Sequence, residues 1–367
     1  MSTSIRNISV AIDGTKSSGF CIELDGTRWR LDNFMLSQSL LSPNTLSFSL
    51  HKEPDERINE VSFNVCGAII GKEVLVSLET ESIEKESLKA DTDSVADIEF
   101  AGVITGASGS RNRSEFTVNV EACSWDALLN DNPTCKSFEN QTLNDIVNDV
   151  VDDYSEHLKT DVDARFTDTI PYSVQYNESN YLFLQRLARR YGEWLYNDGQ
   201  KMVFGNLPKG ESVRLAYPSQ DVPSYNVDLK MRHVAFNHVA SSYNSYDANE
   251  KEGIEEMQRE YNTLSEQVFQ ASQSCFVKPT LQNLHSGGFA DTDGRETVLN
   301  VSTKTQARGE KASMLTYSGT TYCSKLKIGS KLVIVDNYMP DASALEKSNV
   351  EQDEMLITEL VHYFLSL

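Results

Sequence analysis

Histidines are the first candidates for chemistry in this 367-residue chain, because they ligate metals and exchange protons near neutral pH. His233 and His238 lie five residues apart, in or near a predicted strand. An odd spacing puts two side chains on opposite faces of a strand, so the two rings should not share a metal ion. We interpret this pair as structural or surface histidines and predict no metal site.

The common catalytic motifs are also missing from the sequence. It contains no HExxH, no GxSxG and no GxxxxGK. Asp13-Gly14 and Ser108-Gly109-Ser110 fit ordinary turns. Carboxylate pairs are abundant, but acid–base catalysis needs two carboxylates with separated pKa values in one cleft, which a sequence does not show. We therefore predict that the protein is not an enzyme and has neither catalytic residues nor a cofactor.

The charge balance narrows the possible partners. The chain has 54 Asp and Glu against 33 Lys and Arg, a formal net charge of −21. Such a chain repels nucleic acid and acidic membrane surfaces, so we predict no nucleic-acid binding and no stable membrane anchoring. Acidic runs such as 79–86 and 250–260 are interpreted as solvated faces, with docking on basic partners as the alternative.

The sequence also indicates where the protein is made and in which redox state. It has no uncharged apolar stretch of about 18 residues, and Met1–Gly14 lacks the apolar run of a signal peptide. We expect assembly in the cytoplasm without Sec-type export. The six cysteines form no CxxC pair, so we expect reduced thiols rather than a disulfide scaffold.

The first predicted part of the fold is β-rich and covers residues 1–129. Segments of strand-forming residues are separated there by Gly, Asn, Asp and Pro, which are typical of turns. This pattern predicts a β-barrel or a β-sandwich. The predicted strands are Asn7–Ile12, Thr45–His51, Glu73–Glu79, Ile98–Thr105 and Glu115–Ala122.

A mixed α+β part follows at residues 130–212. A stripe from Leu143 to Leu158 behind a Thr142 cap predicts one core helix. A second helix should start at an Asn177 or Ser179 cap and end at Gly192. Its apolar face comprises Leu184, Leu187, Ala188, Tyr191 and Leu195. Strands at 193–197 and 201–205 should then form a hairpin around a two-residue Asp198-Gly199 turn, with the second strand half-buried.

The third part, residues 213–354, reads as a second β-rich domain, and a closing strand lies in 355–367. Predicted strands cover 230–237, 297–303, 331–335 and 355–363, with a helix at 306–316. A helical insertion is expected at about 248–274, where apolar residues step by three and four. They are Ile254, Met257, Tyr261, Leu264 and Val268. We favour a helix lying on its own barrel over one packing against a neighbouring subunit.

The letters of the middle part carry a resemblance. The string N-E-S-x-x-x-F-L-x-R-L-A, then a glycine, an aromatic strand, a D-G turn and V-F-G, resembles the VgrG and phage late-control-D family. The residues that match are Asn177, Glu178, Ser179, Phe183, Leu184, Arg186, Leu187, Ala188, Gly192, Asp198, Gly199, Phe204 and Gly205. The resemblance implies that they are structural.

Further segments in the same order extend this resemblance to roughly residues 137–364. Ser137–Leu143 is similar to a short motif upstream of the N-E-S string, and 307–332 looks like the family's second barrel. Leu356–Phe364 resembles its closing hub strand, in which His362 would be structural. Gly102–Gly106 looks like a strand of the first hub barrel. The N-E-S string and the three segments within 137–364 are four weak motifs in the right order, and together they make a fairly specific signal.

The resemblance implies a fold and a role. The fold would be α+β and mainly β, with two β-barrel-like domains joined by a smaller α+β domain, as in phage tail hubs. The protein would be a structural hub of a contractile injection machine such as the type VI secretion system. As a homotrimer it would adapt a threefold spike to a sixfold tube and help carry effectors. Its other partners would be an Hcp-like or tail-tube hexamer, baseplate components and a needle or PAAR-type tip, and the machine would export it.

Alternatives remain open at this stage. The hub could belong to a phage tail or an extracellular injection machine. A tail-tip cell-wall hydrolase or a monomeric adaptor presenting the Ile254–Val268 face are other readings. Family members usually continue into an OB-like domain and a β-needle, whereas this sequence stops at Leu367. Either the sequence is a piece of a longer chain or the spike is a separate protein.

Overall fold

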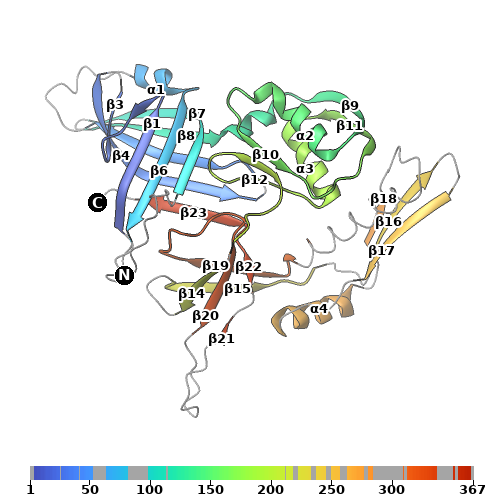
Figure 1. The fold of residues 1–367 in the computed structure, drawn as a ribbon. Coiled ribbons are helices and arrows are strands. Elements are labelled where there is room, and N and C mark those ends of the chain that lie inside the picture. Colours follow the sequence, from blue (N-terminus) through green and yellow to red (C-terminus); the bar gives the residue numbers. More distant parts are fainter. Residues whose placement is uncertain are drawn as a thin grey trace, which may run out of the picture.

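The computed structural model shows three units along the chain (Figure 1). It describes residues 4–24, 26–40, 42–52, 63–81, 98–112, 115–210, 212–217, 222–232, 237–244, 249–256, 263–276, 280–283, 309, 312–336, 350–351 and 354–364.

The first unit is one large sheet that draws on both ends of the chain. Its strand order is β2-β1-β6-β7-β8-β5-β4-β23, and β3 pairs with β4. The strands are β1 Ser4–Ile12, β2 Thr15–Lys16, β3 Cys21–Leu24, β4 Thr27–Ser39, β5 Thr45–Lys52, β6 Glu73–Glu81, β7 Ile98–Arg111, β8 Phe116–Ser124 and β23 Glu359–Phe364. Helix α1, Asn64–Ile69, packs Val65 and Ile69 into the core of this unit.

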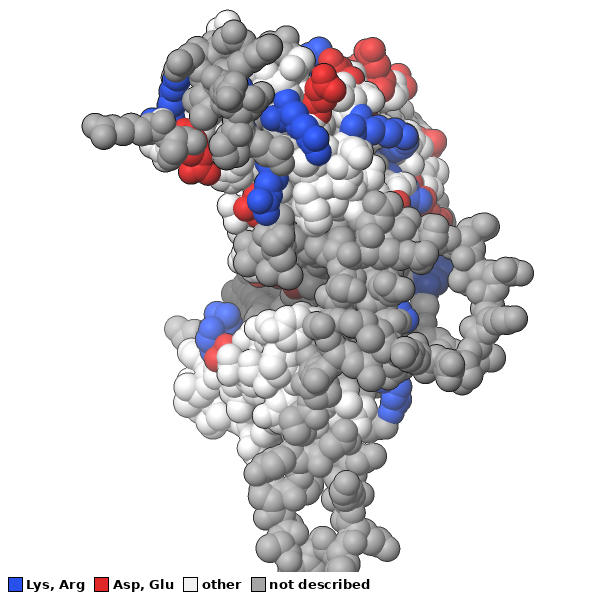
Figure 2. Space-filling model, turned by 90° about the vertical axis from the view of Figure 1, so that its left-hand side faces the viewer, with Lys and Arg blue, Asp and Glu red and all other residues white. Residues whose placement is uncertain are grey.

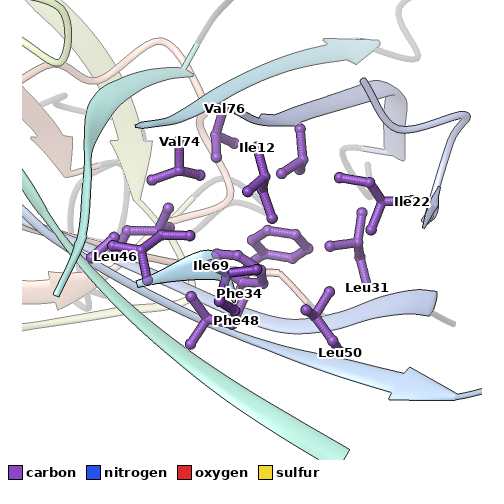
Figure 3. Packing of buried hydrophobic residues seen from close by; sticks show 14 of the residues in the cluster. Ile12, Ile22, Leu31, Phe34, Leu46, Phe48, Leu50, Ile69, Val74 and Val76 are labelled. Atoms are coloured by element: carbon purple, nitrogen blue, oxygen red, sulfur yellow. The ribbon is translucent and has the colours of Figure 1, made fainter. Parts of the chain in front are cut away.

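Alternation along the strands builds that core. In β8, Phe116, Val118 and Val120 are buried while the residues between them are partly or fully exposed, as the period of two requires. The labelled side chains converge from facing strands into one space (Figure 3). The five strands expected between Asn7 and Ala122 are therefore confirmed as β1 and β5–β8.

Strand β4 was not predicted, although it is 13 residues long. Its register with β5 shifts between Asp32 and Met35, and Asn33 has a positive φ of 55°. This β-bulge interrupts the alternation, so the sequence shows no clean period of two there.

The closing strand expected at 355–363 is broken in two. β22, Met355–Leu356, pairs with β20, Lys331–Asp336, whereas β23 pairs with β4 in the first sheet. The C-terminal strand returns to the N-terminal sheet (Figure 1).

The middle unit packs two helices against short strands. It contains 3-10 helices at Trp125–Asn130 and Asp152–Tyr154, β9 Thr134–Gln141, α2 Leu143–Val151, β10 Thr160–Asp163, β11 Ile170–Glu178, α3 Asn180–Tyr191, β12 Trp194–Asn197 and β13 Met202–Gly205. The apolar faces predicted for the two helices are buried in one cluster.

The predicted helix starts and the Gly192 stop are confirmed, but α2 ends at Val151 and not at Leu158, which lies in no helix. Thr142 and Asp145 form a capping box at α2. Ser179, rather than Asn177, caps α3, because its Oγ accepts from the Leu182 N–H at 3.3 Å. Gly192 ends α3 in the left-handed conformation, with φ of 73°.

The hairpin after α3 differs from the prediction in two ways. Asn197 pairs with Met202, so the loop spans four residues rather than two. The Asp198 carboxylate holds it by accepting from the N–H groups of Gln200 and Lys201, both at 3.0 Å. β13 is also not half-buried, because every one of its residues is buried.

The β12–β13 ribbon is buried on both faces because it separates two cores. Leu195, Met202 and Phe204 belong to the core of the middle unit. Tyr196 and Val203 belong to a second core, shared with residues of the third unit such as Leu215. The ribbon therefore joins the two units through side chains on opposite faces.

The third unit consists of small sheets: β14 Val213–Tyr217, β20, β21 Val350–Glu351 and β22; β15 Ser224–Leu229 and β19 Leu315–Thr320; and β16 Asn237–Asn244, β17 Asn249–Glu256 and β18 Thr280–Asn283. The strand at 331–335 is confirmed as part of β20. The strand at 230–237 is wrong over Lys230–Arg232, which follow β15, and the helix at 306–316 is wrong at its end, which lies in β19. The strand expected at 297–303 lies outside the described residues.

The helical insertion is only partly correct. Helix α4 covers Thr263–Cys275 and includes Leu264 and Val268, but Ile254 lies in strand β17. The step of three and four therefore does not mark one continuous helix, because β-sheet pairing with β16 outweighs the local pattern. Met257 and Tyr261 lie outside the described residues.

Replacing Gly205 by alanine should destabilise the ribbon. Gly205 has φ of 129°, and an added Cβ would lie 2.0 Å from the Asp163 carbonyl oxygen. We expect the free energy of unfolding to fall by about 3 kcal/mol in chemical denaturation. Gly210→Ala is the control, because a Cβ there meets nothing within 4 Å. Equal stability of the two variants would contradict this account of the ribbon.

Candidate functional site

The described residues contain no group of three His, Cys, Asp or Glu side chains that could hold a metal ion. No helix among them is long and apolar enough to cross a membrane. His238 lies in β16, and His233 lies outside the described residues. None of the six cysteines forms a disulfide bond in the structure. The candidate sites are therefore the contacts that hold the units together and the surfaces they expose.

The N-E-S string fixes the start of α3. Asn177 adopts a positive φ of 50° at the end of β11, and Ser179 caps the helix. Glu178 at the end of β11 forms a salt bridge with Arg186 of α3. The distance from Arg186 Nη2 to Glu178 Oε1 is 2.5 Å. The same nitrogen donates to the Val174 carbonyl at 2.6 Å. The Arg186 side chain therefore connects α3 to β11. The apolar residues of the motif in α3 are buried in the core of the middle unit.

The residues after α3 reinforce the chain reversal. The buried Glu193 carboxylate accepts from the N–H groups of Arg165 and Phe166, both at 2.9 Å, and from Arg165 Nε at 3.2 Å. The Arg165 guanidinium also donates to the Gly192 carbonyl. Glu193 thereby ties the strand that follows the helix to the 164–166 segment, which sequence reasoning missed because the partners are 27 and 28 residues apart.

Asn197 is the centre of a buried polar junction between the first and middle units. Its Nδ2 donates to Asp126 Oδ1 at 2.8 Å, and its Oδ1 accepts from the Gly199 N–H at 2.9 Å. Asn44 Nδ2, from the segment before β5, donates to the Asn197 carbonyl at 3.1 Å. Burial raises the pKa of the Asp126 carboxyl, while hydrogen bonds from Ser124 and Asn197 oppose that shift.

Gly199 brings the hairpin loop against the first sheet. The Ala101 N–H of β7 donates to the Gly199 carbonyl at 2.7 Å. A Cβ on Gly199 would lie 2.4 Å from the Glu99 carbonyl oxygen, and its φ is 110°. The glycine of the D-G motif is therefore required by close backbone approach as well as by its conformation.

His362 lies where the first sheet, the hairpin loop and the third unit meet. A small cavity there is lined by Gln38, Ile98, Glu99, Asp198, Leu326, Lys327, Ile328 and His362. Burial lowers the pKa of His362 to about 4, so the ring is neutral at pH 7. This location fits the structural role expected for His362.

Among the residues that the structure describes, three exposed apolar faces offer surfaces for partners, one on each unit. On β11 the alternate residues Tyr172, Val174 and Tyr176 are exposed, Tyr176 by 77%. The residues between them, Ser173 and Gln175, are buried. The usual rule of apolar inside and polar outside is therefore inverted on this strand.

The second face lies on the β15–β19 ribbon. Val227 and Leu229 alternate along β15, and Met231 follows two residues later with 53% of its surface exposed. Tyr317 and Leu315 of β19 lie opposite Val227 and Leu229 and complete this face. We call it the ribbon face.

The third face lies at the end of the first sheet. Val361 and Tyr363 of β23 pair with Ser37 and Met35 of β4. Met35, Val361 and Tyr363 are all exposed, Tyr363 by 71%. We call this set the edge face.

The helix α4 covers its own unit with at least part of its surface. Phe269 packs against Met314, and Val268 lies beside this pair. Leu264 is exposed. The predicted set from Ile254 to Val268 thus does not form one helical face, and its role in an interface stays a proposal.

Charge is unevenly spread over the surface. Seen from the side of the C-terminus, the upper part carries Lys, Arg, Asp and Glu side chains, whereas the described residues of the third unit below are mostly uncharged (Figure 2). Copies of an acidic chain can approach through such an uncharged surface without strong repulsion.

Sequence and fold comparisons define the class of protein. A sequence model of the phage tail baseplate hub (GPD) family matches residues 59–365. The chain therefore belongs to the phage tail baseplate hub family. A comparison with curated proteins found no match.

Two solved tail-protein structures share the fold of this chain. The 43 kDa tail protein of prophage MuSo2 from Shewanella oneidensis matches with a TM-score of 0.61 and 14% identity, covering 97% of this chain and 94% of that one. A tail protein from Neisseria meningitidis MC58 matches with a TM-score of 0.63 and 9% identity, over 98% and 93% of the two chains. The Escherichia coli c3393 protein, a type VI secretion component, matches with a TM-score of 0.42 and 17% identity, over 60% and 56%. The two tail proteins show that the fold is mainly β and of the phage tail hub type.

Truncating Asn197 should destabilise the junction. Asn197→Ala leaves the buried Asp126 carboxylate without the Nδ2 donor and the Gly199 N–H without its acceptor. We expect a loss of about 3 kcal/mol in the free energy of unfolding, measured by chemical denaturation. Asn132→Ala, at an exposed loop position, is the control and should change stability by less than about 0.5 kcal/mol. Similar effects of the two changes would refute the importance of this junction.

Acid should weaken the fold through His362. In the unfolded chain the His362 ring is protonated with its ordinary pKa of 6.5, whereas in the folded chain its pKa is about 4. The unfolded state therefore binds more protons between these values, and stability falls as the pH decreases through them. From pH 7 to pH 4.5 the wild type should lose about 2 kcal/mol more unfolding free energy than His362→Gln. Parallel pH profiles of the two proteins would contradict a buried neutral His362.

Proposed function

We propose that this protein is a structural hub subunit of an injection machine with a phage-type tail, and that it works as a homotrimer. The ring adapts a threefold spike to a sixfold tube, and each chain presents two similar β-rich units to that tube. The match to the baseplate hub family over residues 59–365 is the observation that carries this proposal.

The division of the chain supports two tube-facing units. We propose units at 1–129, 130–212 and 213–354, with 355–367 as a closing segment that returns to the first unit. The buried Asn197 junction and the ribbon between two cores hold the first and third units at a fixed relation to the middle one. A hub under mechanical load benefits from such fixed junctions, since a mobile hinge would misalign the tube.

The partners follow from this role. They are two further copies of the chain, a hexameric tail-tube or Hcp-like protein, baseplate components, and a spike, needle or PAAR-type tip with its effectors. The chain would be assembled in the cytoplasm and exported by the machine. Its function is mechanical, and no enzymatic step is part of the proposal.

A phage-type tail is favoured over a type VI system by the family match and by the two tail proteins that share the fold along almost their whole length. A type VI hub is the second candidate, supported by the N-E-S motif and its resemblance to VgrG. The test between them is binding to a purified tail-tube protein or to an Hcp hexamer.

The oligomeric state tests the proposal most directly. Light scattering after size-exclusion chromatography should give three times the chain mass of 41.1 kDa. The interface must then avoid contacts of carboxylates with one another, because three copies carry three times −21 charges. A chain that stays monomeric at every concentration would contradict the proposed trimer.

A further inference from the structure

We propose that the ring closes head to tail, with the edge face of one copy docking on the ribbon face of the next copy. The edge face is Met35, Val361 and Tyr363, and the ribbon face is Val227, Leu229 and Met231, with Tyr317 and Leu315. This inference rests on the proposed homotrimer and assigns the two surfaces that form it.

Symmetry requires two different surfaces. In a threefold ring every subunit uses one patch toward its left neighbour and another toward its right neighbour, so the contact is heterologous. The two faces meet this requirement because they lie on different sheets, one on β23 and β4 and the other on β15 and β19. The Arg232 N–H donates to Ser272 Oγ of α4 at 3.4 Å, so the Met231 end of the ribbon face lies beside α4.

Exposure indicates that both faces are covered in the assembled protein. Tyr363 and Met231 expose 71% and 53% of their surface, and Met35, Val361, Val227 and Leu229 are also exposed, whereas Leu315 and Tyr317 are half-buried. Contiguous apolar residues on strands are unfavourable in water and invite pairing with other strands. An ordered neighbour would remove that cost.

Charge complementarity selects a second copy as the occupant. Across the outer face of the first sheet, Tyr363 pairs with Met35, Met35 with Ser47 and Ser47 with the exposed Glu121. Glu359 borders the same face from the other end of β23. The edge face is thus flanked by carboxylates.

The ribbon face is flanked by cations where it ends. Lys230 and Arg232 are exposed on either side of Met231, against one exposed carboxylate, Asp228, between Val227 and Leu229. Contact between a carboxylate-flanked face and a cation-flanked face offsets the repulsion between two acidic chains. Two edge faces would instead repel each other, because both are flanked by carboxylates. A head-to-tail contact is therefore favoured over a symmetric one.

Two complementary variants test this arrangement. Val361→Asp with Tyr363→Asp damages only the edge face, and Leu229→Asp with Met231→Asp damages only the ribbon face. Each variant alone should be monomeric in light scattering, while the wild type is trimeric. An equimolar mixture should give twice the chain mass, because each copy keeps one intact face and only one contact can form.

The matched control is Tyr172→Asp with Tyr176→Asp, which makes the same kind of change on the exposed face of β11. This control should remain trimeric. A variant that stays trimeric, or a mixture that stays monomeric, would overturn the head-to-tail assignment while leaving the trimer intact. A wild type that is monomeric would instead overturn the proposed trimer and this interface together.

Circular dichroism checks that both variants are folded, and formation of the two-chain complex checks it independently. If an aspartate pair unfolds the chain, Val361→Ser with Tyr363→Ser and Leu229→Ser with Met231→Ser replace it. The expected masses are the same, because these changes remove the apolar contact without adding charge.

Discussion

The burial of the β12–β13 ribbon on both faces is the constraint on which the arrangement of units depends. Side chains of alternate parity enter different cores, with Met202 and Phe204 in one and Tyr196 and Val203 in the other. Neither core can repack alone, because the shared backbone fixes both sets at once. The hairpin loop then presses Gly199 against β7, so the first sheet is joined to the same ribbon.

Polar groups give this junction its geometry. Apolar packing tolerates small rotations, but Asn197 must satisfy Asp126, Asn44 and Gly199 simultaneously, and these belong to separate segments. Burying these polar groups carries a desolvation penalty, but their hydrogen bonds fix the relative orientation of the segments. Any displacement would leave a donor or an acceptor unpaired. Orientation is what the proposed role, alignment of a spike with a tube, would require.

Local signals were readable from the sequence, whereas long-range pairings were not. The caps Thr142 and Ser179 and the Gly192 stop act within a few residues, and each was predicted correctly except for the choice between Asn177 and Ser179. The return of β23 to β4 joins residues more than 300 positions apart, and nothing in either strand specifies it. The Ile254 to Val268 pattern failed for the same reason, because pairing with β16 decides the conformation of β17. The exposed faces were missed because apolar alternation predicts burial, and only the fold shows which side is left open.

The exposed faces connect the architecture to the proposed role. A protein with one partner needs one apolar surface, but this chain exposes apolar strand residues on all three units, on β11, β15 and β23. Its acidic charge would disfavour nonspecific contact between copies, so contact is confined to places where carboxylates are few or are met by cations. The carboxylates beside the edge face would meet the cations beside the ribbon face. Both faces would be buried when the ring closes. The β11 face of the middle unit would then remain on the assembled ring, available to a protein other than this one.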